Sequence, residues 1–314
     1  MVYLNRDSAL IHKDSLSDLI DILLDDHSIM PFPPNLFLIG AQKAGTTFLA
    51  NLLGQHSDIC VSYPKETAYF TRNFGKGLDW YNAKFSQLDA KYLLDATTGY
   101  SISPLPDVDR CTAENPQWGV PEKIRQVCPD AFFLYLIRDP VKRTYSSYWH
   151  NVRAGHEERS FRGALDADTS YLRTSRYCDQ LDQYRNCFPL ERIHILQFED
   201  LVATPLATVN ECLSFLRLEP LTGLETESAH NRSFVYRPGL SYLNKLLSNQ
   251  GGLNKIAKTL RPLIPGRLKS ILFGAMTSRI PRISSADEQY LQKYFREHNN
   301  RLETNYGVDI SAWQ

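Results

Sequence analysis

The 314-residue sequence has no excess of either charge, because 35 Lys and Arg balance 35 Asp and Glu. A neutral total predicts no bulk attraction to nucleic acid or to a membrane surface. No apolar run approaches the roughly 20 residues that cross a bilayer. No basic segment followed by an apolar stretch opens the chain, so we expect no secretory signal. These absences predict a cytoplasmic protein without a transmembrane segment and without nucleic-acid partners.

Motifs for disulfides, metals and hydrolase chemistry are also missing. The eight histidines show no H-E-x-x-H spacing, and no G-x-S-x-G segment marks an α/β-hydrolase. We therefore expect no metal. The cysteines are scattered without a C-x-x-C pair, which in a chain of this size favours reduced thiols; they are Cys60, Cys111, Cys128, Cys178, Cys187 and Cys212.

Short apolar runs alternate with helical patterns along the chain. The strand-like runs are 36–39, 59–62, 132–137 and 193–198, and the helical patterns are 46–56, 122–128, 141–152, 176–188 and 209–216. This alternation predicts an α/β fold with a central parallel sheet flanked by helices. We expect an acidic amphipathic helix at 14–26 within a leader of residues 1–34, followed by one domain over 35–314.

The most informative segment follows the first predicted strand. Gly40 and Gly45 keep the G-x4-G spacing of a phosphate-binding loop, but Lys43 precedes the second glycine, where a Walker A loop has lysine after it. Thr46 takes the lysine's place at the start of the next helix. Helix amides, hydroxyls and one ammonium therefore converge on an anion, without the usual arrangement for a magnesium-bound γ-phosphate.

A second anion site is predicted at the end of the strand 132–137. Arg138 follows this strand, Pro140 suits the first turn of a helix, and Ser146 lies two turns into that helix. Arg138 and Ser146 could meet at one phosphate, the arginine through a charged fork and the serine through its hydroxyl. The alternative is a surface arginine and a helical serine without a ligand.

Together these segments resemble the sulfotransferases that use PAPS (3′-phosphoadenosine 5′-phosphosulfate). The residues that carry the resemblance are 42–47, 138–146, 65–70, 76–81, 198–201 and Trp313, with similarity to heparan sulfate sulfotransferases and to bacterial sulfotransferases of small molecules. The resemblance implies a P-loop NTPase-like sulfotransferase fold. It also implies a set of donor-binding residues: Gln42, Lys43, Ala44, Gly45, Thr46, Thr47, Arg138 and Ser146.

The resemblance assigns the general base to Glu66, with Lys43 stabilising the leaving oxygen; the alternative for Glu66 is a solvated loop carboxylate beside Lys65. One departure stands at Ala96, where glycan sulfotransferases carry a lysine near the substrate. Asp95 is then either a supporting carboxylate or a strand-end residue satisfied by the backbone. We expect Tyr69 and Tyr100, together with Glu66 and Asp95, near the acceptor.

Residues 228–286 contain ten Lys or Arg and no Asp or Glu, which predicts a basic, mostly helical lid. This excess could attract an anionic ligand, dock residues 240–282 on acidic lipids, or remain solvated. Arg237 is a candidate for the 3′-phosphate or for a lid salt bridge. Tyr177 could stack on adenine, line the acceptor pocket, or belong to the core.

The sequence thus predicts an enzyme that moves the sulfonate of PAPS to a hydroxyl or amine of a small molecule, releases PAP and serves bacterial secondary metabolism. A glycan acceptor is the first alternative. A kinase on the same fold, or a nucleotide-binding module without catalysis, is a remoter one.

Overall fold

The computed structural model describes residues 33–107, 109, 114–225, 234–236 and 277–313. The helix expected at 14–26 lies outside these residues. Among the helices that are described, none combines the length and the apolar character required to cross a bilayer.

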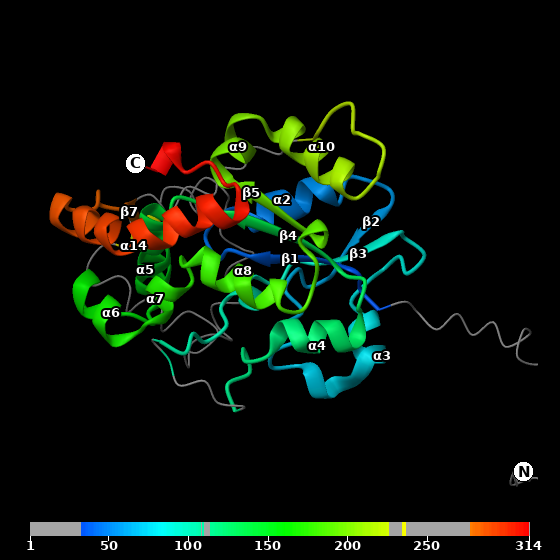
Figure 1. The fold of residues 1–314 in the computed structure, drawn as a ribbon, viewed down its shortest axis with the longest axis horizontal. Coiled ribbons are helices and arrows are strands. Elements are labelled where there is room, and N and C mark those ends of the chain that lie inside the picture. The colour runs from blue at the N-terminus through cyan, green and yellow to red at the C-terminus, as the bar shows by residue number, and fades with distance from the viewer. Residues whose placement is uncertain (1–32, 108, 110–113, 226–233, 237–276, 314) are drawn as a thin grey trace, which may run out of the picture. The chain divides into compact units, whose positions relative to one another are not determined.

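A five-stranded parallel sheet forms the centre of the domain (Figure 1). Its strands are β1 (Leu36–Gly40), β2 (Ile59–Val61), β3 (Tyr92–Asp95), β4 (Phe132–Ile137) and β5 (Ile193–Gln197), in the order β2-β3-β1-β4-β5. β1 is the central strand, with β2 and β3 on one side and β4 and β5 on the other. Because β1 and β4 are parallel neighbours, the loops that follow them lie side by side where the strand order reverses. Ligands of open α/β sheets bind at such a point.

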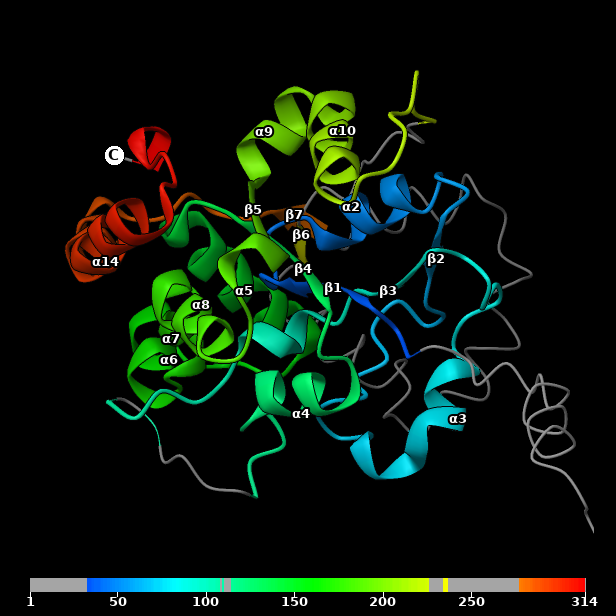
Figure 2. The ribbon, with the colours of Figure 1, turned by 45° about the vertical axis from the view of Figure 1, so that its right-hand side comes forward.

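Helices cover both faces of this sheet, as Figures 1 and 2 show. One face carries α2 (Thr46–Leu53), α9 (Phe198–Ala203) and α10 (Pro205–Phe215), and the other carries α4 (Val120–Val127) and α8 (Tyr177–Arg185). After β4 comes α5 (Pro140–Ala154), which packs, like α8, against α14 (Ser285–Tyr306). The short helical elements are η1 (Phe74–Lys76), α3 (Gly77–Asn82), η2 (Thr98–Ser101), α6 (Phe161–Ala167), α7 (Ser170–Arg173), η3 (Leu190–Arg192) and η5 (Ser311–Trp313).

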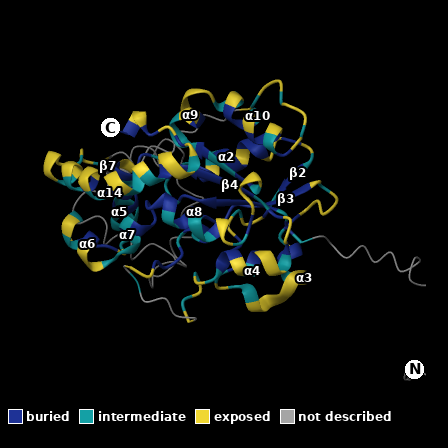
Figure 3. Cartoon of the chain, in the orientation of Figure 1, coloured by how far each residue is buried: buried dark blue, intermediate teal, exposed yellow. Residues whose placement is uncertain are grey.

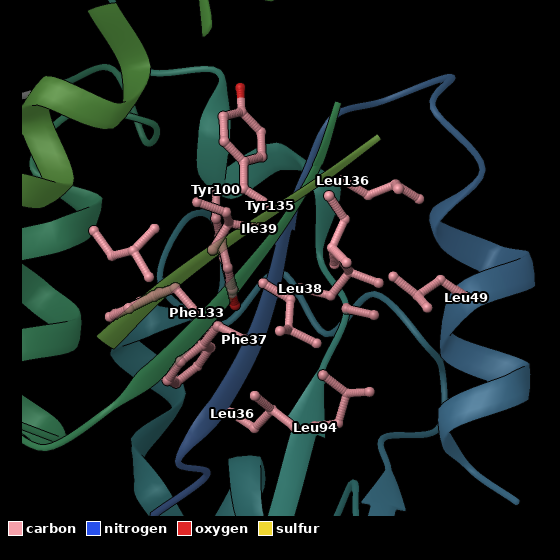
Figure 4. Packing of buried hydrophobic residues seen from close by; sticks show 14 of the residues in the cluster. Leu36, Phe37, Leu38, Ile39, Leu49, Leu94, Tyr100, Phe133, Tyr135 and Leu136 are labelled. Carbon is pink, nitrogen blue, oxygen red and sulfur yellow. The ribbon is translucent and has the colours of Figure 1, made fainter. Parts of the chain in front are cut away.

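The strands are buried because helices cover them on both sides, while the outer helix faces remain exposed (Figure 3). Phe37 of β1 stacks on Phe133 of β4, with ring centroids 5.6 Å apart, and Phe133 contacts Tyr184 of α8 at 5.1 Å. Figure 4 shows Leu49 of α2 across the strands from Phe133. Burial of large side chains on both faces stabilises the sheet by the hydrophobic effect and fixes the loops at its edge.

The predicted parallel sheet and flanking helices are confirmed. The strand 132–137 has the predicted bounds, and the other predicted strands agree within one residue at each end. The prediction missed β3, whose four residues are buried between β1 and β2. It also missed α14, whose N-cap Ser284 accepts a hydrogen bond from the amide of Asp287 at 3.1 Å.

Of the basic segment 228–286, the structure describes residues 234–236 and 277–286. There β6 (Phe234–Tyr236) pairs antiparallel with β7 (Thr277–Arg279). Arg237 and most of residues 240–282 lie outside the described residues, so the predictions made for them stay predictions.

Candidate active site

The loop between β1 and α2 has the backbone of an anion site. Gly45 has a φ of 93° and caps α2, which begins at Thr46. A Cβ on Gly45 would lie 2.8 Å from Cδ2 of Phe198, so both the backbone angle and the available space require glycine. The first amides of a helix lack acceptors within the helix, and they carry its positive dipole end. This loop therefore directs amides, together with the Thr46 hydroxyl, toward an anion.

Positive charges gather around Lys43. Burial and then the charges of Arg153, Arg138 and Arg143 lower the pKa of the Lys43 amine. Burial and then the charge of Lys43 lower the pKa of His150 to about 4, so this imidazole is neutral at physiological pH. Cations crowded in a partly buried place repel one another, and a bound anion relieves that repulsion. The cluster therefore suits a ligand with several negative charges.

Arg138 stands at the end of β4 and reaches the same loop. Its Nη1 donates to the Lys43 carbonyl at 3.3 Å, and its guanidinium lies over the Phe198 ring, 4.7 Å from the centroid. Its own carbonyl accepts from the Tyr177 hydroxyl at 2.7 Å. Its Nε is buried without a partner among the described residues. A fixed guanidinium with an unused donor is suited to bind an oxyanion.

The start of α5 is fixed by the residues after Arg138. Asp139 caps the helix by accepting from the amide of Val141 at 2.8 Å. Ser146 is half-buried on this helix, and among the described residues no hydrogen bond joins its side chain to Arg138. The neighbouring Ser147 donates to Gln42 Oε1 at 3.5 Å, which links α5 to the loop after β1. Sequence reasoning did not single out Ser147.

Arg143 is a second residue that sequence reasoning missed. Its side chain is fully buried on α5, and burial lowers its pKa to about 10. Its described hydrogen-bond partners are neutral: Ser175 Oγ, the Tyr171 carbonyl and Thr144 Oγ1. Because these partners carry no negative charge, they do not cancel the charge of Arg143, which adds positive potential to the site.

Glu66 lies beside the anion loop, at the carboxyl end of β2. Its Oε1 is 3.2 Å from Lys65 Nζ and accepts from Thr98 Oγ1 at 3.2 Å. Lys65 Nζ also donates to Thr46 Oγ1 at 3.3 Å. The Glu66 side chain is 45% exposed, so it can meet a substrate from solvent. Lys65 therefore contacts both Glu66, the predicted general base, and Thr46 of the loop that is predicted to bind the donor.

Asp95 is a buried structural centre at the end of β3. Its two oxygens accept five hydrogen bonds, from Thr67 Oγ1, Tyr81 OH, Tyr100 OH, and the amide and hydroxyl of Thr97, at 2.6–3.1 Å. Burial raises its pKa, which the donated hydrogen bonds oppose. These contacts fix the segment that precedes Thr98, whose hydroxyl holds Glu66.

Replacing Asp95 by Ala should lower the free energy of unfolding by about 3 kcal/mol, because it leaves several buried hydroxyls without their acceptor. Urea unfolding followed by circular dichroism measures the change. Asp89→Ala, at an exposed position before β3, is the matched control. An Asp95→Ala protein as stable as the wild type would contradict this structural role.

The three tyrosines predicted to line the donor or acceptor site are buried in the domain. Tyr69 is 3% exposed and stacks on Tyr81 with centroids 4.1 Å apart, while Tyr100 is fully buried. Tyr177 is 1% exposed and packs against Tyr135 at 5.8 Å. In the loop itself Ala44 is buried and Thr47 is exposed. No group of His, Cys, Asp or Glu suited to hold a metal occurs among the described residues.

Fold and site together define an α/β protein of the P-loop-like class. A model described as the sulfotransferase family matches residues 34–222. The chain is 26% identical over 286 residues to human heparan sulfate glucosamine 3-O-sulfotransferase 6, with 88% of this chain and 73% of that protein covered. It is 24% identical over 291 residues to a Drosophila melanogaster bifunctional heparan sulfate N-deacetylase/N-sulfotransferase, covering 86% of this chain and 25% of that protein. A sulfotransferase structure from Alicyclobacillus acidocaldarius shares the fold, with a TM-score of 0.60 and 21% identity over 89% of this chain and 98% of that one.

The chain belongs to the sulfotransferase family, whose enzymes take PAPS as the sulfonate donor. The residues present fit this donor. PAPS carries several negative charges, and the cationic side chains of Lys43 and Arg138 meet at the loop after β1, where Arg138 Nη1 donates to the Lys43 carbonyl at 3.3 Å. The Nε of Arg138 is buried without a partner among the described residues, so a donor remains for an oxyanion.

Arg138→Met should weaken PAP binding by about 10- to 100-fold, because a charge-assisted contact is lost. Isothermal titration calorimetry with PAP measures the change. Arg192→Met, which removes an arginine that pairs with Asp130 near the start of β5, should bind PAP like the wild type. Equal affinity in both variants would remove Arg138 from the donor site.

Proposed function

We propose that this chain transfers the sulfonate of PAPS to a hydroxyl or amine of a small-molecule acceptor and releases PAP. One observation carries the proposal. A carboxylate open to solvent, Glu66, is tied through Lys65 to Thr46 of the anion loop. A base for the acceptor therefore stands next to the place where the donor's reactive end would bind.

The chemistry assigned to these residues is an in-line displacement at sulfur. Glu66 takes the acceptor's proton while the acceptor oxygen or nitrogen forms its bond to sulfur. Lys43 donates a hydrogen bond to the bridging oxygen, which keeps the electron pair of the breaking sulfur–oxygen bond. Thr46 and Thr47 hold the 5′-phosphate, and Arg138 and Ser146 hold the 3′-phosphate.

A small-molecule acceptor, such as an intermediate of secondary metabolism, is supported by Ala96. This residue is fully buried and stands where glycan sulfotransferases carry a lysine near the substrate. A glycan acceptor is the second candidate, because the relatives named above act, by their names, on heparan sulfate. The two candidates share the donor and the base and differ in the acceptor.

An acceptor screen tests the proposal. Purified protein is incubated with sulfur-35-labelled PAPS and two panels, one of hydroxylated or aminated small molecules and one of desulfated and sulfated glycans. Label transferred to the first panel supports the proposal, and label transferred only to glycans selects the second candidate. Magnesium-dependent transfer of phosphate from ATP, or PAP binding without transfer to any acceptor, would contradict it in favour of a kinase or a binding module.

A further inference from the structure

Lys65 joins Glu66 to Thr46, but the proposed mechanism gives its own ammonium group no part in binding the donor. Its Nζ lies 3.3 Å from Thr46 Oγ1, on the first residue of α2, and 3.2 Å from Glu66 Oε1. The lysine side chain is 20% exposed, against 45% for Glu66. An exposed ion pair between neighbouring residues contributes little to stability. Lys65 is largely buried, and it also reaches Thr46 at the start of α2, in a different part of the chain. A contribution to stability from the Lys65–Glu66 ion pair therefore does not explain its position.

The backbone of Lys65 is held where such a reach is possible. Its carbonyl accepts from the amide of Ala96 at 3.2 Å and from Ser62 Oγ at 3.0 Å. The Ser62 amide in turn donates to the Leu94 carbonyl at 2.9 Å. These bonds attach the loop after β2 to the end of β3. The Lys65 side chain therefore extends toward Thr46 from a backbone that is held by hydrogen bonds.

An ammonium group has three donors, and the two described contacts of Lys65 leave the third available. Thr46 lies at the amino end of α2, where the dipole and the first amides already favour negative charge. The 5′-phosphosulfate of PAPS carries two negative charges in one small group. Lys43 alone supplies one full positive charge from its own loop, and Lys65 supplies a second from a different loop.

We propose that Lys65 is a further donor-binding residue, whose ammonium contacts the 5′-phosphosulfate beside Thr46 while it holds Glu66 next to the sulfur. The inference rests on the function proposed above and adds a residue to its site. It makes Lys65 a link between the base and the donor, so that loss of its charge affects donor binding as well as turnover.

Three variants test the inference: Lys65→Met removes the charge, Lys65→Arg keeps it, and Lys91→Met removes an exposed lysine at the opposite end of β3. Affinity for PAP is measured by calorimetry, and kcat and KM for PAPS are measured with an acceptor found in the screen. We expect Lys65→Met to bind PAP at least about tenfold more weakly and to lose about 100-fold in kcat/KM for PAPS. Lys65→Arg should recover most of both losses, and Lys91→Met should match the wild type.

The outcomes separate the inference from the proposed function. Wild-type affinity for PAP and wild-type kcat/KM in Lys65→Met would overturn the inference and leave the proposed function standing. A fall in thermal stability with unchanged affinity per folded molecule would also overturn it, because Lys65 would then only tether the loop. A wild-type protein that neither binds PAP nor transfers sulfonate would overturn both. If Lys65→Met does not fold, Lys65→Gln, which also removes the charge, takes its place. A fall in PAP affinity and in kcat/KM for PAPS in Lys65→Gln supports the contact, and wild-type values of both overturn it.

Discussion

Replacing Glu66 by Gln should lower turnover by about 10²- to 10⁴-fold, the usual range for loss of a general base. The amide of Gln has nearly the shape of the carboxylate and can still accept from Thr98 Oγ1, as Glu66 does at 3.2 Å. It cannot take a proton from an acceptor hydroxyl. The substitution therefore removes the base while it leaves the local structure nearly intact.

The measurement pairs kcat, from labelled PAPS and a saturating acceptor, with PAP affinity from calorimetry. PAP affinity should stay within about threefold of the wild type, since Glu66 is expected to act on the acceptor. Glu191→Gln, on the exposed η3 turn before β5, is the matched control and should keep full activity. Full activity in Glu66→Gln would remove Glu66 from the mechanism.

Helices and strands could be predicted from the sequence where residues adjacent in the chain determine them. The run Phe132–Ile137 is continuously apolar because β4 is buried on both faces, and Asp139-Pro140 is a strong signal for the start of a helix. Gly45 was predictable from the G-x4-G spacing, and the structure gives the physical reason for glycine there, because its φ is 93°.

Contacts between distant segments could not be predicted in this way. β3 has four residues and no clear alternation, and its strand character comes from pairing with β1 and β2 on either side. The ligands of the Asp95 carboxylate come from positions 67, 81, 97 and 100, whose meeting depends on how the loops fold back. Nothing in the sequence around Asp95 distinguishes such a centre from a supporting carboxylate.

The same limit applies to the charges around the donor loop. Lys43 and Arg138 were predictable because each follows an apolar strand in a phosphate-binding pattern. Arg143 and Arg153 lie on α5 among other polar residues, and the spacing does not tell which of them faces inward. Their effect on Lys43 appears only when β1 and β4 are placed side by side.

Lys43→Met should lower kcat by about 10²- to 10³-fold, comparable to the loss of one donor that stabilises charge in a transition state. Methionine keeps the length and removes the ammonium that would face the bridging oxygen. Lys43→Arg keeps the charge and should retain part of the activity. Lys142→Met, an exposed lysine that pairs with Asp139 at 3.1 Å, controls for general loss of positive charge near the site. Equal kcat in Lys43→Met and wild type would exclude this role.

The pH dependence gives a second readout for Lys43. Burial first, and then Arg153, Arg138 and Arg143, lower its pKa below the usual 10.5, so its ammonium is lost at a lower pH than that of an ordinary lysine. Activity with an aliphatic hydroxyl acceptor should therefore fall on the alkaline side as Lys43 becomes neutral. In Lys43→Arg this fall should move to higher pH, because a guanidinium holds its proton more strongly than an amine in the same surroundings.

Arg153→Met should move the same alkaline fall to higher pH, since it removes one of the charges that lower the Lys43 pKa. The shift has a fixed sign, because a nearby positive charge always favours the neutral amine. A pH–rate profile of kcat for wild type, Lys43→Arg and Arg153→Met measures it. An alkaline limb that stays in place in both variants would show that another group titrates there. A limb that moves upward in both identifies Lys43 as the cation that must stay charged for sulfonate transfer.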